Sequence, residues 1–294
     1  MRAVSLLLLC AACTPNFQSA SDVVDLRVLA IRSDPPEAQM DLDAGTVQDV
    51  TVQVLVADSS PSLSATMTGL LCLPTDSLTC DAASPFKLPP VTQPVGRAFS
   101  YPLRVPPDTL RGALANDKLN GLGGVRVQLQ INVTAGSPAK VVSAEKILLF
   151  SRNDHVPNHV PLLDAVDVTF DGGAPSTLKP GETLQLVQGK TFGLRPRPHT
   201  CDAGTCPNGI ESYDTLDLSG KVIHLTEQFA YSFFTTAGAE LDRDGADEPR
   251  DGGAPPDGLA RIDSTGAADG GTLWIVVRDG RGGESWITLP WQSN

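Results

Sequence analysis

The sequence has no cluster of lysine and arginine residues, and its basic residues are outnumbered by acidic ones, 22 to 34. Proteins that bind nucleic acid usually carry a basic patch, so this composition argues against a nucleic-acid partner. The formal net charge is −12. An acidity of this size favours solubility and says little about fold.

A long apolar run is missing from the N-terminus, MRAVSLLLLCAACTPNF, in which a short apolar stretch follows Arg2. About six to nine apolar residues cannot span a bilayer as a helix, so the segment is predicted to be a secretion signal. Small residues Ala11 and Ala12 precede Cys13. This arrangement resembles a bacterial lipoprotein signal, which implies that Cys13 is acylated and becomes the first residue of the mature chain.

Cys10 departs from that signal pattern, because it stands where leucine is usual, and bulky Leu9 before it fits a cleavage site poorly. An ordinary cleaved signal with incidental cysteines is the alternative. Residues 1–12 are expected to be removed, and residues 13–22 to be a lipidated tether to the membrane. Loss of Arg2 would change the net charge from −12 to −13. Each buried methylene of an acyl chain contributes roughly 0.8 kcal/mol, so two or three chains attach firmly.

The other four cysteines form two local pairs, in CLPTDSLTC and CDAGTC. An exported protein reaches an oxidising compartment, so the pairs predict the disulfides Cys72–Cys80 and Cys201–Cys206. The alternative is a zinc site built from His199, Cys201 and Cys206, with Asp202 as a fourth ligand. The spacing is not the CxxC of common zinc sites.

Helical apolar periodicity is rare, whereas 24 prolines and 27 glycines favour short strands joined by turns. Residues 50–56 and 125–133 alternate between apolar and polar side chains, as half-buried strands do. One helix is expected within PPDTLRGALANDKLNG, with Asp108 as its N-cap and Leu110, Ala113 and Leu114 facing inward. The sequence therefore predicts an all-β fold.

A polar segment interrupted by prolines, residues 152–164, separates two strand-rich halves and is predicted to be a linker. The expected domains are residues 23–151 and 165–294.

The chain ends in TLWIVVRDGRGGESWITLPW, which is compatible with either a β-hairpin or a phosphate-binding loop. A phosphate loop would need a helix after its glycines, whereas a strand-like run follows. A hairpin with a Gly-rich turn is therefore predicted.

Several short motifs resemble those of bacterial immunoglobulin-like or PKD-like β-sandwiches. They are a VxVxDGxGG-like run near the end, a Pro-Gly turn and an aromatic strand leading into TxAG, carried by Val276, Asp279, Gly280, Gly282, Gly283, Pro180, Gly181, Phe234, Thr236, Ala237 and Gly238. With the signal and LRVLAIRSDPPEA, the chain is similar to uncharacterised lipoproteins of myxobacteria-like species. The resemblance implies two immunoglobulin-like β-sandwich domains in tandem after a lipoprotein signal peptide, and it supplies no catalytic residues.

Motifs for catalysis and cofactor binding are scarce. No Gly-x-Ser-x-Gly motif occurs, and paired carboxylates discriminate little in an acidic protein. Asp242, Asp244 and Asp247 offer clustered oxygens for calcium, but their D-x-D-G-x-D spacing departs from an EF-hand loop. Residues 242–258 are therefore expected to form a mobile, solvated acidic loop. No catalytic residue, cofactor or metal is predicted.

Two functional classes remain open. The first is a non-enzymatic lipoprotein of the cell envelope, held to a membrane by its lipid, which binds or scaffolds an envelope protein or polysaccharide through its loops. The outer membrane, facing the periplasm or the cell surface, is the expected location. The second is an accessory carbohydrate- or substrate-binding component of an envelope enzyme system. A row of exposed aromatic side chains would favour it, but Trp274, Trp286 and Trp291 are expected to pack in the core or at a sheet edge.

Overall fold

The computed structural model describes residues 19–60, 63–75, 79–81, 86–152, 156–170, 173–201, 206–217, 219–250 and 258–294. Cys13 and Asp202 lie outside these ranges, so the lipidation of Cys13 stays a prediction. The described residues are mostly β-strand, with α1 (Pro107–Asn116) as their one helix. This confirms the all-β prediction. No helix in this part of the chain combines the length and apolarity needed to cross a bilayer.

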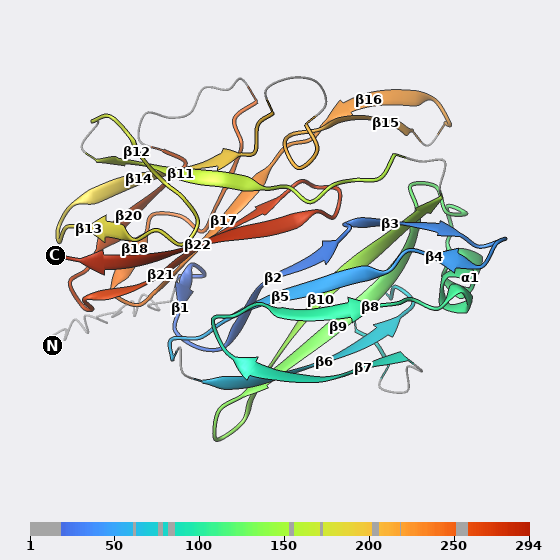
Figure 1. The fold of residues 1–294 in the computed structure, drawn as a ribbon, viewed down its shortest axis with the longest axis horizontal. Coiled ribbons are helices and arrows are strands. Elements are labelled where there is room, and N and C mark those ends of the chain that lie inside the picture. The colour runs from blue at the N-terminus through green and yellow to red at the C-terminus, as the bar shows by residue number, and fades with distance from the viewer. Residues whose placement is uncertain are drawn as a thin grey trace, which may run out of the picture.

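The N-terminal half, residues 24–152, contains two sheets that pack around one core (Figure 1). A six-stranded sheet runs in the order β4 (Thr46–Val47), β3 (Glu37–Asp41), β10 (Lys140–Arg152), β9 (Val125–Ala135), β6 (Ser64–Cys72) and β7 (Phe86–Pro94). A three-stranded sheet contains β2 (Arg27–Asp34), β5 (Val50–Ala57) and β8 (Phe99–Leu103). The alternating residues that the sequence indicated, from Val125 to Val133 on β9 and from Val50 to Val56 on β5, face this core.

The C-terminal half, residues 156–294, repeats the plan with different strands. One sheet runs β1 (Asp22–Val23), β17 (Ala230–Thr236), β21 (Gly270–Arg278), β22 (Glu284–Ser293) and β13 (Leu184–Leu186), and β19 (Gly245–Asp247) also pairs with β17. The facing sheet runs β12 (Ser176–Leu178), β11 (Leu163–Phe170), β14 (Thr191–Pro198), β20 (Ala260–Ser264) and β18 (Ala239–Leu241). A separate hairpin contains β15 (Ser212–Leu216) and β16 (Val222–Thr226).

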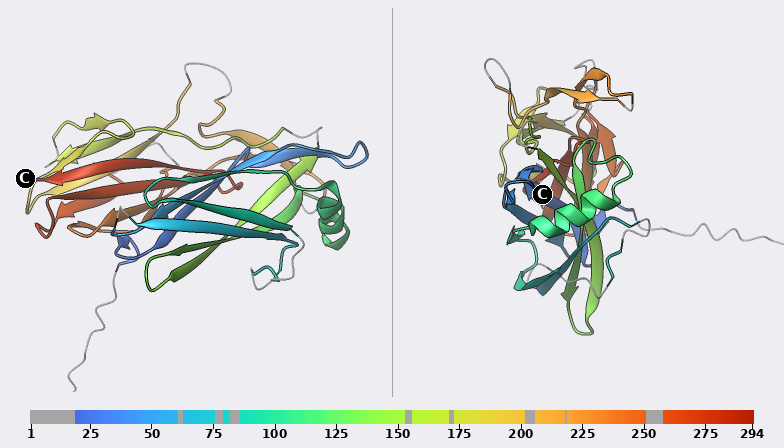
Figure 2. Two further views of the ribbon diagram at one scale, coloured as in Figure 1. Left: turned by 60° about the horizontal axis from the view of Figure 1, so that its bottom comes forward. Right: turned by 90° about the vertical axis from the view of Figure 1, so that its right-hand side faces the viewer.

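The two halves lie side by side along the long axis, and α1 lies at the end remote from the C-terminus (Figure 2). A third apolar cluster joins them: Leu29, Ala30, Leu55 and Ala57 of the N-terminal half contact Trp274 and Val276 of β21. The opposite face of β21 packs into the core of its own half. A strand buried on both faces is typically a near-continuous apolar run, which explains the LWIVV sequence. The division into two independent domains stays a prediction.

The first strand crosses the expected domain boundary. β1, at residues 22–23, pairs in parallel with Thr235 and Thr236 of β17 instead of joining the N-terminal half. Val23 is fully buried in the cluster between the halves. The end of the expected tether is therefore built into the C-terminal sheet.

The helix begins earlier than the sequence indicated. Pro106 is the N-cap residue and Pro107 the first helical residue, so Asp108 lies in the first turn. Proline at the first helical position is favoured because its fixed φ suits the helix and its missing N–H would be unpaired there anyway. Leu110 and Ala113 are buried, as expected.

The acidic segment after β17 is more ordered than predicted. Its residues 245–247 form β19, which pairs antiparallel with residues 230–232 of β17. Asp242 accepts a hydrogen bond from the backbone N–H of Arg261 at 2.8 Å. The prediction of a mobile loop over residues 242–258 is thus wrong for its first part, and residues 251–257 lie outside the described residues.

Both expected disulfides are present, Cys72–Cys80 and Cys201–Cys206. The first disulfide closes a loop. Two glutamine side chains of β9 form hydrogen bonds with the backbone of this loop. The side-chain oxygen of Gln128 accepts the backbone N–H of Thr75 at 3.1 Å, and that of Gln130 accepts the N–H of Cys80 at 2.8 Å. The apolar side chains of β9 therefore pack in the core, and its glutamine side chains bind the disulfide loop.

Candidate functional site

The terminal hairpin is confirmed, because β21 and β22 pair antiparallel along their whole length. Its turn, residues 279–283, needs glycine at two positions, since Gly280 and Gly282 have φ of 77° and 101°. The Asp279 carboxylate holds the turn by accepting the backbone N–H groups of Arg281 at 2.7 Å and Gly283 at 2.9 Å. Asp279 is buried, whereas Gly280 next to it is exposed.

Arg281 at the tip of this turn reaches acidic residues from both halves. Its guanidinium lies 3.5 Å from the carboxylate of Glu37 on β3. On the other side it lies 3.0 Å from Glu227 and 3.4 Å from Glu211. The Tyr213 ring of β15 stacks on it, 3.9 Å from the guanidinium carbon to the ring centroid. The single guanidinium of Arg281 thus contacts three carboxylates and an aromatic ring.

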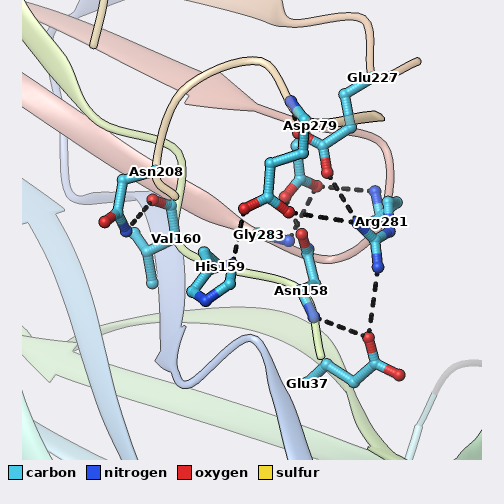
Figure 3. A network of polar contacts seen from close by, with 10 residues as sticks. Glu37, Asn158, His159, Val160, Asn208, Glu227, Asp279, Arg281 and Gly283 are labelled. Atoms are coloured by element: carbon cyan, nitrogen blue, oxygen red, sulfur yellow. Dashed lines mark hydrogen bonds and ion pairs between the residues drawn. The ribbon is translucent and has the colours of Figure 1, made fainter. Parts of the chain in front are cut away.

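The connector between the halves completes this cluster (Figure 3). The backbone N–H of Asn158 donates to Glu37 at 2.9 Å, and its side-chain amide donates to Asp279 at 2.7 Å. The Ser285 hydroxyl donates to the carbonyl of Pro161. Residues 156–162, part of the segment expected to be a linker, therefore form hydrogen bonds with both halves. We call Glu37, Asn158, Glu211, Glu227, Asp279 and Arg281 the Arg281 cluster.

A second ion-pair group lies beside the turn, around the buried carboxylate of Glu284. Glu284 contacts Arg278 at 2.7 Å and Lys146 of β10 at 3.6 Å, and it accepts the backbone N–H of Ile31 at 3.1 Å. Lys146 also donates to the carbonyl of Gly282 at 2.7 Å. Burial lowers the pKa of Lys146, and the charge of Glu284 opposes that shift. The turn is thus bonded to the N-terminal half on two sides.

The Arg281 cluster carries more negative than positive charge. Burial raises the pKa of Glu227 to about 7, and the charges of Asp279 and Glu211 add to the rise, whereas Arg281 opposes it. Burial also raises the pKa of Asp279. A buried carboxylate that shares one cation with others is easier to protonate than one in water. The pKa of Glu227 therefore lies well above the usual range of a glutamate.

The described histidines form carboxylate pairs. His159 lies 2.6 Å from Glu211, His199 lies 2.8 Å from Asp164, and His224 lies 2.9 Å from Asp214. A serine hydrolase would need a serine hydroxyl on the free ring nitrogen. Among the described residues, no hydrogen bond joins these rings to a serine hydroxyl.

The two candidate metal sites have different outcomes. His199, Cys201 and Cys206 do come together, but the two sulfur atoms are joined in a disulfide and so are not thiolate ligands. The carboxylates of the calcium candidates do not converge in space: Asp242 pairs with Arg243, and Asp247 lies in β19. In the described ranges, His199, Cys201 and Cys206 are the sole set of such side chains close enough to share a metal ion.

An open groove of about 710 Å³ adjoins the Arg281 cluster. Glu37 lines the groove and belongs to the cluster as well. Its walls come from both halves: the end of β3, the glycine-rich loop before β9 and the end of β10 face the β15–β16 hairpin. A concave surface of this volume is in the range of ligand pockets. The groove is therefore the candidate binding surface.

Aromatic side chains do not form a row of exposed rings at the terminal hairpin. Trp274 and Trp291 are 4% and 1% exposed, and Trp286 packs against the apolar cluster between the halves. Tryptophan is the usual stacking platform for sugars, so these positions do not support the carbohydrate-binding alternative.

Sequence reasoning finds the turn but misses its partners. The local pattern places Asp279 and Arg281 in a hairpin turn, and nothing local marks Glu37, Asn158 or Glu227 as their neighbours. The signal that the sequence does carry is the density of charge in DGRGGE between two strongly apolar strands. Charged side chains on a turn between buried strands need partners when the turn itself is covered.

Comparisons with known proteins identify no family. No family model matches the chain, and no curated protein matches it. Among solved structures, the crystal structure of red sea bream transglutaminase is similar over 92% of this chain, with 14% sequence identity and a TM-score of 0.28. The chain spans about a third of the length of that structure, 32%. A likeness at this level identifies neither the fold nor an activity.

Proposed function

We propose that this protein is a non-enzymatic lipoprotein of the cell envelope, held to a membrane through Cys13, which binds a partner in the groove between its two halves. The lipid attachment is supported by the signal-like N-terminus, and export by the two disulfides. The location that fits is the outer membrane, facing the periplasm or the surface. In this proposal the protein consists of two tandem β-sandwich domains, and the groove between them is the binding surface.

The observation that carries the binding role is that both halves build the groove while the charged groups beneath it bind each other. Arg281 and Asn158 hold the carboxylates of Glu37, Glu227 and Asp279 in fixed positions. A preorganised surface of this kind binds a partner with little loss of conformational freedom. The histidine–carboxylate pairs stabilise the surface and do not take part in chemistry.

Site-specific photo-crosslinking in intact cells tests this role. A photoreactive amino acid at Leu216, in the groove, is expected to give a covalent adduct with an envelope component. The matched control is Val141 on β10, which is also an exposed apolar residue but lies at the opposite end of that strand from the groove. Adducts at both positions, or at neither, would contradict a binding role for the groove.

A further inference from the structure

The β15–β16 hairpin carries an apolar surface that the described chain leaves uncovered. Leu216 and Val222 lie opposite each other at its end and are 46% and 59% exposed. Both line the groove. Apolar side chains grouped on a concave surface mark interaction sites more often than scattered ones do. This end of the hairpin therefore offers contact to a partner with apolar side chains.

The same hairpin has open edges. β15 and β16 pair with each other and, within the described ranges, with no other strand. A two-stranded sheet is marginally stable by itself, and each free edge presents N–H and C=O groups to a third strand. Tyr213 secures the hairpin to the body through Arg281, so the edges are held next to the groove. Extended peptides add to such edges through backbone hydrogen bonds.

The charge of the groove indicates which sign of charge a partner should carry. Asp41, Asp43 and Asp214 line it, together with one cation, Arg152. Glu37 also lines it but is paired with Arg281, and Asp214 lies 2.9 Å from His224. Asp43 and Asp214 are exposed. Surfaces that associate usually have complementary potentials, so the groove suits a positively charged partner.

We infer that the groove binds an extended peptide segment of a partner protein in which lysine or arginine and aliphatic side chains occupy every second position, on one face of the strand. This inference rests on the proposed binding role and names the class of partner. The aliphatic side chains pack on Leu216 and Val222, and the basic ones face Asp43 and Asp214. The peptide backbone pairs with an edge of the hairpin. A small cation would use the carboxylates and leave the apolar contacts and the open edges unused.

Binding of synthetic peptides to the purified full-length protein tests the inference. The probe is a fluorescent hexapeptide, Leu-Ser-Lys-Ser-Leu-Ser, measured by anisotropy, and the comparison is the same peptide with glutamate in place of lysine. We expect the basic peptide to bind and the acidic one not to bind. Leu216→Ser is expected to raise the Kd about tenfold or more, because an apolar contact of about 1.4 kcal/mol or more is lost. Asp43→Asn is expected to raise the Kd several-fold and to weaken its dependence on salt.

Matched controls separate the groove from general attraction to an acidic protein. Asp263→Asn makes the same charge change at an exposed position of β20, at the other end of the C-terminal half (Figure 1). It is expected to leave the Kd unchanged. An equal effect of both substitutions, equal binding of the acidic peptide, or no binding of the basic peptide would overturn the inference. Displacement of the peptide by spermidine at an equal concentration would assign the groove to small cations instead. Crosslinking at Leu216 in cells without peptide binding would leave the proposed function standing and reject this partner class.

Discussion

The guanidinium of Arg281 lies 3.5 Å from the carboxylate of Glu37, although the two residues belong to opposite halves of the chain. Both side chains are almost fully buried, 13% and 4% exposed. The tip of a C-terminal hairpin is thereby bonded to β3 of the N-terminal half. The relative position of the halves depends on this contact as well as on the apolar cluster around Trp274.

Replacing Arg281 with methionine should destabilise the protein strongly. Glu37, Glu211 and Glu227 would then lie buried without their shared cation, and breaking a buried pair costs about 3–5 kcal/mol. Urea denaturation measures the free energy of unfolding. Arg243→Met is the control, because it removes an exposed pair with Asp242 and should cost about 1 kcal/mol or less. Equal losses in the two variants would contradict a structural role for the Arg281 cluster.

Glu227 should make stability fall as pH rises towards neutrality. Its pKa is about 7 in the folded protein against an ordinary value of 4.5, so the folded state binds the proton more tightly. The contribution is complete below pH 4.5 and is lost as pH rises through 7. Glu227→Gln, which stays uncharged, should therefore lose less stability between pH 5 and pH 8 than the wild type does.

Unfolding measured at both pH values in the two proteins tests this difference. Glu240→Gln, an exposed change on β18, is the control and should follow the wild-type curve. A Glu227→Gln variant with an unchanged pH profile would show that this carboxyl does not titrate in the cluster.

The part of the fold that the sequence predicts depends on local patterns. The alternation from Val125 to Val133 and the turn glycines of the last hairpin are periodic or conformational signals, and the strands they predict are confirmed. The Arg281 cluster joins residues far apart in sequence, so no period or spacing encodes it. β19 is not predicted because Gly245 and Asp247 are poor strand formers, and its pairing with β17 outweighs that preference.

Gly283→Ala should destabilise the protein by about 1–3 kcal/mol through overpacking. A Cβ there would meet the Asp279 carboxylate and lie 2.7 Å from Cδ of Pro161. Gly112→Ala in α1 is the matched change, because no atom lies within 4 Å of the position that its Cβ would take. It should stabilise the protein by about 0.5–1 kcal/mol. Thermal unfolding of the two variants is expected to shift in opposite directions, and a shared direction would contradict the tight packing at the turn.

The two disulfides should leave no free thiol outside the signal region. In a variant with Cys10 and Cys13 replaced by serine, thiol titration after denaturation without reductant is expected to detect none. Replacing Cys72 and Cys80 together with alanine should lower stability by about 2–3 kcal/mol, as a short closed loop contributes in the chain-entropy model. Four reactive thiols in the denatured protein would contradict both pairings.

Cys13 should determine membrane attachment. We expect Cys13→Ser to move the protein from the membrane to the soluble fraction, because each buried methylene of the missing acyl chains contributed about 0.8 kcal/mol. Cys10→Ser is the matched control and should stay with the membrane, since Leu9 makes Cys10 a poor acylation site. Fractionation of cells followed by immunodetection measures both. Membrane association that survives Cys13→Ser, or is lost in Cys10→Ser, would reject the assignment.

The position of β1 adds a geometric consequence to that attachment. Asp22 and Val23 are fixed in the C-terminal sheet by pairing with Thr235 and Thr236. From Cys13 to Asp22 the chain spans about nine residues, which reach at most about 30 Å when fully extended. The end of β17 should therefore lie near the membrane surface. A fluorophore at Thr236 is expected to be quenched by lipid-borne quenchers, and one on α1 at Arg111 much less so. Equal quenching at the two positions would contradict this orientation.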